Sequence, residues 1–86
     1  MNDSLIRPYN SIPETVKVDP VSSTLQYIGY APPGTATSES RWKMSKITID
    51  GSGNITDVQW AYSVVDGSKI SGYRFAYNDR ASLTYG

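Results

Sequence analysis

Apolar and polar residues alternate with a period of two over most of the chain from residue 24 onward. This period is that of a half-buried β-strand, because successive side chains of a strand point to opposite faces of its sheet. In one such segment Val58, Trp60 and Tyr62 share a face. The segments that this alternation and their β-forming composition predict as strands are residues 24–30, 42–50, 55–62, 70–77 and 80–85.

Turn-forming residues separate these segments. The Pro-Pro-Gly sequence at 32–34 ends the first predicted strand, and Asp50-Gly-Ser-Gly-Asn54 is a strong hairpin signal between the second and the third. Asp66-Gly67 marks a further turn. The pattern predicts an all-β fold, a small antiparallel sheet or barrel of four to six strands, with at most one helical turn near residues 36–41.

The first 23 residues differ from the rest. Pro8, Pro13 and Pro20 favour extended backbone, and the segment has no helical period. It is either a disordered tail or an arm that orders against a neighbour, and its apolar content favours the arm. We therefore divide the chain into an extended N-terminal arm, residues 1–23, and a β-domain, residues 24–86. The arm side chains that we expect a partner to bury are Ile6, Tyr9, Ile12, Val16 and Val18.

Composition narrows the classes of function. The chain has 86 residues, no Cys, no His and a net charge of zero. Domains this small often need a disulfide, a metal or association with other chains, and here association is favoured. A pI near 6.1 argues against nucleic acid as the main partner. We expect no membrane partner either, since no apolar stretch approaches the roughly 18 residues of a membrane span, and the N-terminus does not resemble a secretory signal.

Candidate chemistry is sparse. Without His, a catalytic triad lacks its usual base, and the adjacent pairs Ser45-Lys46 and Ser68-Lys69 would point to opposite strand faces. The oxygen-bearing residues 50–57 begin like a calcium loop, but Ile55 replaces the required glycine and Ala61 the bidentate glutamate. We therefore expect no enzyme activity, no cofactor and no metal site.

The aromatic residues are the most informative side chains that remain. They are interpreted as cross-strand core pairs, as a protein interface or as a platform on which sugars stack. Trp42 is the largest candidate for the core, and Gly29 would let a neighbouring ring approach the backbone closely. Arg80 is expected to pair with a carboxylate, to stack on a Tyr or to stay solvated at the surface. The candidate partner-binding residues of the β-domain are Trp60, Tyr62, Tyr73, Tyr77 and Arg80.

Two motifs carry a resemblance to a known family. Gly-Tyr-Ala-Pro-Pro-Gly-Thr at 29–35, followed by Trp42, and Asp-Arg-Ala-Ser-Leu-Thr-Tyr at 79–85 resemble the pattern of small tailed-bacteriophage virion structural proteins. The resemblance spans residues 24–85, and residues 63–77 depart from it by being longer and richer in Tyr.

The resemblance implies a non-enzymatic virion component, made in the host cytoplasm, that joins or decorates other subunits in several symmetric copies. Its partners would be other virion proteins and copies of itself. The alternative is a carbohydrate- or receptor-binding module attached to a tail fibre, and only in that case is a glycan expected as the partner.

Overall fold

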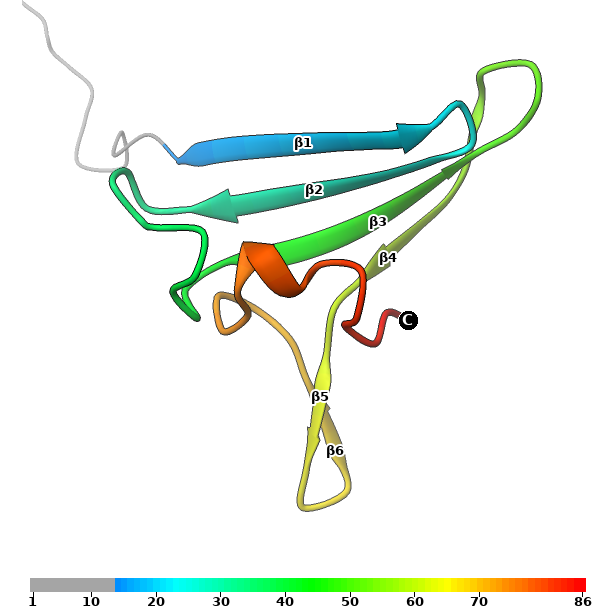
Figure 1. The fold of residues 1–86 in the computed structure, drawn as a ribbon. Coiled ribbons are helices and arrows are strands. Elements are labelled where there is room, and N and C mark those ends of the chain that lie inside the picture. Colours follow the sequence, from blue (N-terminus) through cyan, green and yellow to red (C-terminus); the bar gives the residue numbers. More distant parts are fainter. Residues whose placement is uncertain (1–13) are drawn as a thin grey trace, which may run out of the picture.

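The computed structural model describes residues 14–86, which form an all-β fold (Figure 1). Strands β1 to β4 make one antiparallel sheet in the order β1-β2-β3-β4, and β5 and β6 pair as a separate hairpin. The sheet is open, so the predicted all-β class is confirmed and the barrel alternative is wrong. The elements are β1 (Thr15–Ser22), β2 (Leu25–Ala31), β3 (Lys43–Ile49), β4 (Ile55–Trp60), β5 (Ser63–Val65), β6 (Ser68–Ile70) and the 3₁₀-helix η1 (Tyr77–Asp79).

The predicted strands 24–30, 42–50 and 55–62 correspond to β2, β3 and β4, and the hairpin loop at Asp50–Asn54 joins the last two. The C-terminal predictions are wrong. Of the predicted strand 70–77, only Ile70 lies in a strand, at the end of β6, and Phe75 forms an isolated bridge with Trp42, because Gly72 adopts a φ of 108° and turns the chain out of the hairpin. Residues 80–85 contribute only an isolated bridge between Tyr85 and Ala61. The helical turn expected at 36–41 is a non-helical turn, and η1 is the one helical segment of residues 14–86.

The second half of the predicted arm is part of the sheet. Residues 15–22 form β1, which pairs antiparallel with β2 from Thr15 opposite Ala31 to Ser22 opposite Leu25. Alternating Val and charged residues suit a strand, and Pro20 is tolerated because β1 lies at an edge, next to a shift in register. Ile6, Tyr9 and Ile12 lie outside the described residues.

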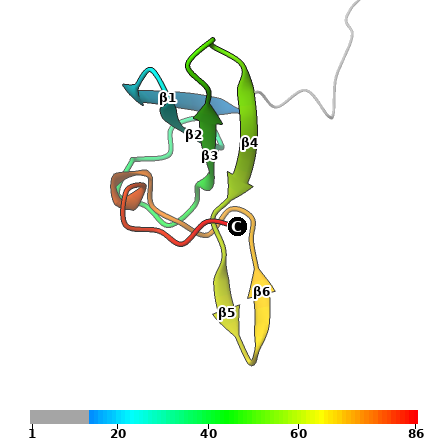
Figure 2. The ribbon, with the colours of Figure 1, turned by 90° about the vertical axis from the view of Figure 1, so that its right-hand side faces the viewer.

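One face of the sheet carries the core. Directly paired residues share a face, which places Tyr27, Gly29 and Ala31 of β2 on the same side as Met44 of β3. Residues 75–86, including η1, cover this side, as Figures 1 and 2 show. We call this side the covered face. The buried cluster beneath the covering segment consists of Tyr27, Ala31, Trp42, Met44, Ala61, Phe75 and Tyr77.

Gly29 is the point at which the covering segment touches β2. A Cβ at this position would lie 2.6 Å from Cδ1 of Tyr77 and 2.9 Å from Cε3 of Trp42. Those two rings contact each other, with centroids 5.3 Å apart. Trp42 is fully buried, as predicted, and its amide and carbonyl exchange hydrogen bonds with those of Phe75 at 2.8 and 3.0 Å. The absence of a side chain at Gly29 therefore lets the covering rings rest on the sheet backbone, as the sequence predicted.

Gly29→Ala is expected to destabilise the fold by about 1–3 kcal/mol, because the added methyl group forces the Tyr77 and Trp42 rings away from β2. Gly51→Ala is the matched control. Gly51 lies in the β3–β4 loop, where an added methyl group would have no neighbour within 4 Å, so a change within about 0.5 kcal/mol is expected. Urea denaturation measures both variants. Equal stability of the two variants would contradict the close approach at Gly29.

Candidate functional site

The second face of the sheet carries many apolar side chains, and no segment of residues 14–86 crosses it as the C-terminal segment crosses the first face (Figure 2). Among these residues only Tyr73 reaches one end of it, and Ser45 and Ile47 at its centre are buried by their neighbours. The strand registers place residues from all four strands on this side, which we call the open face. Val16, Val18 and Val58 are each about half exposed on it, at 52%, 51% and 46%. The residues that these registers place on the open face are Val16, Val18, Gln26, Ile28, Tyr30, Lys43, Ser45, Ile47, Val58 and Trp60.

An aromatic cluster occupies one end of the open face. The Lys43 ammonium lies 5.3 Å from the ring centroid of Tyr30 and 5.1 Å from those of Trp60 and Tyr73. The Tyr30 and Trp60 centroids are 5.9 Å apart. Trp60 is 36% exposed and Tyr73 48% exposed, so the cluster combines a fixed cation with accessible aromatic surface. We call Tyr30, Lys43, Trp60 and Tyr73 the aromatic cluster.

Tyr73 reaches this cluster from the chain after β6 and connects it to the start of β1. Its hydroxyl donates a hydrogen bond to the carboxylate of Glu14, and this bond raises the pKa of Tyr73 above its ordinary value of 10.0. The residue that precedes β1 is thereby held beside the aromatic cluster.

The predicted partner-binding residues fall into separate groups. Val16, Val18 and Trp60 lie on the open face, and Tyr73 lies at its end. Tyr62 lies beside the C-terminal Gly86, with the Lys69 ammonium 4.8 Å from its ring centroid. Tyr77 is buried on the covered face.

Sequence reasoning missed Tyr30 and Lys43 as site residues. Tyr30 could have been found from its position, because it follows Gly29 in the strand and adjacent strand residues point to opposite faces. The position of Lys43 followed only from the β2–β3 register, which places it directly opposite Tyr30.

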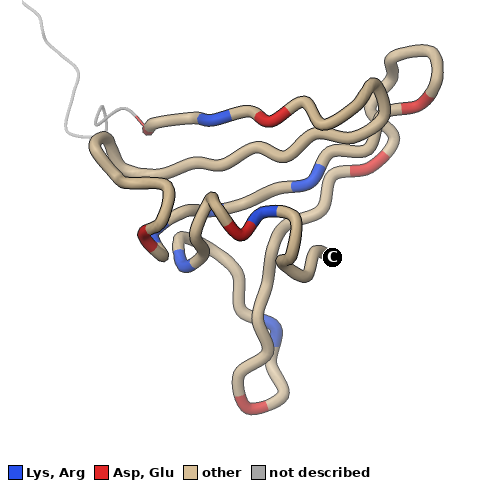
Figure 3. Tube along the Cα trace, in the orientation of Figure 1, with Lys and Arg blue, Asp and Glu red and all other residues tan. Residues whose placement is uncertain are grey.

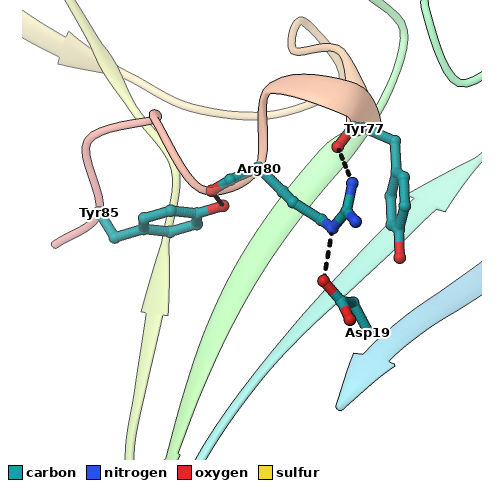
Figure 4. A network of polar contacts seen from close by, with 4 residues as sticks. All are labelled: Asp19, Tyr77, Arg80 and Tyr85. Atoms are coloured by element: carbon teal, nitrogen blue, oxygen red, sulfur yellow. Dashed lines mark hydrogen bonds and ion pairs between the residues drawn. The ribbon is translucent and has the colours of Figure 1, made fainter. Parts of the chain in front are cut away.

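Arg80 holds the covering segment to β1 (Figure 4). Its Nε donates to Oδ2 of Asp19 at 2.7 Å, and its guanidinium carbon lies 4.6 Å from the Tyr77 ring centroid. Arg80 therefore both pairs with a carboxylate and stacks on a Tyr, the two contacts that the sequence offered as alternatives. The carbonyl of Arg80 accepts a hydrogen bond from the Tyr85 hydroxyl at 2.7 Å. Burial raises the pKa of Tyr85 well above its usual range.

The side chain of Asp50 closes the β3–β4 loop. Its Oδ1 accepts hydrogen bonds from the amides of Ser52 at 2.8 Å and Asn54 at 2.9 Å. Within residues 14–86, no three His, Cys, Asp or Glu side chains gather as a metal site would require. The oxygen-rich sequence of this loop is accounted for by hairpin geometry.

The adjacent residues Ser45 and Lys46 do not come together as a catalytic pair. Ser45 is buried and its hydroxyl donates to the carbonyl of Ile28 at 3.3 Å. The register places Ser45 on the open face and Lys46 on the covered face, where the Lys46 ammonium lies 5.5 Å from the Tyr85 ring centroid. Among residues 14–86, no helix has the length and apolarity needed to cross a membrane.

Arg80→Ala is expected to destabilise the fold by about 1 kcal/mol, because it removes a partly exposed ion pair and a cation–π contact. A double-mutant cycle with Asp19→Ala should give a coupling energy of about 0.5–1 kcal/mol that shrinks in high salt. Arg41→Ala is the control, since Arg41 is exposed and makes no ion pair within residues 14–86. A coupling energy of zero would mean that Asp19 and Arg80 do not hold the covering segment.

Asp50→Asn tests the loop through pH. The amide hydrogen bonds from Asn54 and Ser52 lower the pKa of Asp50 below 3.8, so its ionised form stabilises the folded state. This contribution is present above pH 3.8 and is lost as the pH falls through the lower pKa of the folded state. Thermal melts should show wild type above the variant at neutral pH and a gap that narrows in acid. A gap that stays constant with pH would contradict this role.

Known proteins do not supply an interpretation of the open face. No protein-family model, no curated protein and no solved structure matches this chain. The open face is therefore described by its geometry alone: it is a sheet surface on which no second layer of residues 14–86 packs.

Proposed function

We propose that this protein is a non-enzymatic structural component of a bacteriophage virion that joins or decorates other subunits in several symmetric copies. The observation that carries the proposal is the open face. Antiparallel sheets that face water on one side normally place polar side chains there. Here that side presents Val, Ile, Tyr and Trp from four adjacent strands.

Contiguous apolar surface of this kind marks protein interfaces. Trp and Tyr are the residues most enriched among interface anchors, and the partly exposed Trp60 and Tyr73 stand at the end of the Val and Ile rows. A second protein surface placed on the open face would bury these rings and supply the layer that a small β-domain needs. Other subunits of the same particle, including copies of this chain, are the partners that fit this requirement.

The β5–β6 hairpin offers a second, smaller contact. It projects away from the sheet in Figures 1 and 3 and carries exposed Val64 and Val65, at 62% and 43%. Its base is tied to the sheet by the Ser71 hydroxyl, which donates to the carbonyl of Ala61 at 2.7 Å. Isolated two-stranded hairpins are marginally stable in water, so a neighbouring subunit beside β5 and β6 would stabilise it.

The alternative is a carbohydrate- or receptor-binding module, which the exposed rings of Trp60 and Tyr73 favour. A sugar would stack on the faces of these rings. The Lys43 ammonium lies over one face of each, at 5.1 Å, where it competes with a stacked sugar. This placement makes the assembly function the stronger of the two.

The assignment to a phage particle rests on the resemblance. Its motif residues Gly29, Trp42 and Tyr85 all lie against the core of the covered face. The motifs thus coincide with the contacts that build this fold. The partner surface lies largely outside those motifs.

The double variant Val18→Asp/Val58→Asp tests the proposal, because it adds charge to the open face at two half-exposed positions. Gradient-purified particles from the phage lysate that encodes the chain should contain the wild type at a fixed, high copy number by quantitative mass spectrometry. The double variant should fold but fall at least about tenfold in copy number, which corresponds to about 1.4 kcal/mol of binding free energy. Ser40→Asp, at an exposed position outside the sheet, should incorporate normally.

Circular dichroism and thermal melts of the double variant separate lost binding from lost folding. A folded double variant at wild-type occupancy would overturn the role of the open face, and absence of the wild-type chain from particles would overturn the virion assignment. A reproducible glycan-array signal that Trp60→Ala abolishes would favour the alternative.

A further inference from the structure

The aromatic cluster has the form of a site for an extended, proline-containing peptide. Peptides in the polyproline II conformation bind grooves and surfaces lined by aromatic side chains, since the peptide is already extended and loses little entropy on docking. Tyr30, Trp60 and Tyr73 supply three such rings on one side of the sheet. They lie beside Val16 of β1, which is directly paired with Tyr30.

The N-terminal segment of this chain has the matching pattern. Ile6, Tyr9 and Ile12 are spaced by three residues; Pro8 lies between the first two, and Pro13 follows the third. Polyproline II has three residues per turn, so these three apolar side chains would form one stripe along such a segment. Each proline also biases the residue before it, Arg7 or Ile12, toward the same extended conformation.

The length of the arm segment matches the width of the sheet. Six residues from Ile6 to Ile12 span roughly 19 Å at the polyproline II rise of about 3.1 Å per residue. The sheet from β1 to β4 comprises three strand spacings, which is about 14 Å. The stripe is thus long enough to cross all four strands, with Tyr9 near the middle of the aromatic cluster.

The start of β1 favours a second copy as the partner. Pro13 favours extended backbone and Thr15 begins β1, so a chain that stays extended through Glu14 would continue along the line of β1 rather than fold back across the sheet. The first 28 residues contain no glycine, so the segment lacks the residue best suited to reversing its direction. Thirteen extended residues reach roughly 45 Å, enough to cross an adjacent domain of this size.

We propose that residues 5–13 of one copy dock on the aromatic cluster of a second copy, with Ile6, Tyr9 and Ile12 against Tyr30, Trp60 and Tyr73. This inference deepens the proposed function, on which it rests, by naming the segment that covers one end of the open face. If two copies each dock their arm on the other, they form a dimer with exchanged arms. If each copy docks its arm on the next one, the copies form a ring.

A complementation experiment with the full chain tests this exchange. An arm variant carries Ile6→Ser, Tyr9→Ser and Ile12→Ser, and a face variant carries Trp60→Ala. Sedimentation velocity should show concentration-dependent association of the wild type and, for each variant alone, a dissociation constant raised by about a hundredfold or more, as expected for interface anchors. An equimolar mixture should regain association, because the intact arm of the face variant docks on the intact face of the arm variant.

The matched control keeps three substitutions in the arm but places them off the stripe: Leu5→Ser, Arg7→Ser and Asn10→Ser. It should associate like the wild type. Acrylamide quenching provides a second measurement, since Trp42 is buried and Trp60 is exposed to the quencher until the arm covers it. Quenching of the wild type should therefore fall as its concentration rises.

The outcomes separate this inference from the proposed function. A wild type that stays monomeric at all concentrations, or a mixture that does not regain association, would overturn arm exchange. If Trp60 is protected from acrylamide in the monomer and the arm variant loses that protection, the arm docks on its own chain and the second copy is the wrong partner. In each case the virion assignment is decided independently by the copy number in purified particles.

Discussion

The fold depends on the missing side chain at Gly29. Tyr77 and Trp42 lie so close to the β2 backbone that any Cβ there would collide with both rings. This contact seats the C-terminal segment on the sheet, where Trp42 pairs with Phe75 through backbone hydrogen bonds and Arg80 bonds to Asp19 of β1. Gly29 thus allows the covering segment to pack directly on the backbone of β2.

The described part of the chain, residues 14–86, is too short to cover both faces of its sheet. After the strands have formed, the residues from 75 onward suffice to cover one side, while Tyr73 lies at the end of the other. A domain this small buries only about 60% of the surface that its unfolded chain exposes. The remaining Val, Ile and aromatic side chains stay at the opposite surface, where the proposed association with another subunit would contribute the burial that a second layer would have supplied.

The sequence predicted the parts of this arrangement that local pattern controls. Strands β2, β3 and β4 and the Asp50 hairpin follow from alternation and turn residues, and the burial of Trp42 follows from its size. The C-terminal segment misled the same reasoning. Tyr73, Phe75 and Tyr77 alternate like a strand, but Gly72 turns the chain, and Tyr73 joins the aromatic cluster while Phe75 and Tyr77 enter the buried core. The aromatic cluster was not predictable, because it requires the β2–β3 register and the return of Tyr73 to the end of the sheet.

Residues that stabilise the fold and residues of the proposed binding surface are neighbours in the sequence. Gly29 and Tyr30 are adjacent in β2, yet strand alternation sends the first to the covered face and the second to the open face. The same division runs through β3, where Met44 lies in the core and Lys43 in the aromatic cluster. Substitutions of covered-face residues should therefore change the free energy of unfolding, and substitutions of exposed open-face residues should change association. The exposed residues of the open face are free to vary without loss of the fold, because the buried cluster that seats the C-terminal segment lies on the other side of the sheet.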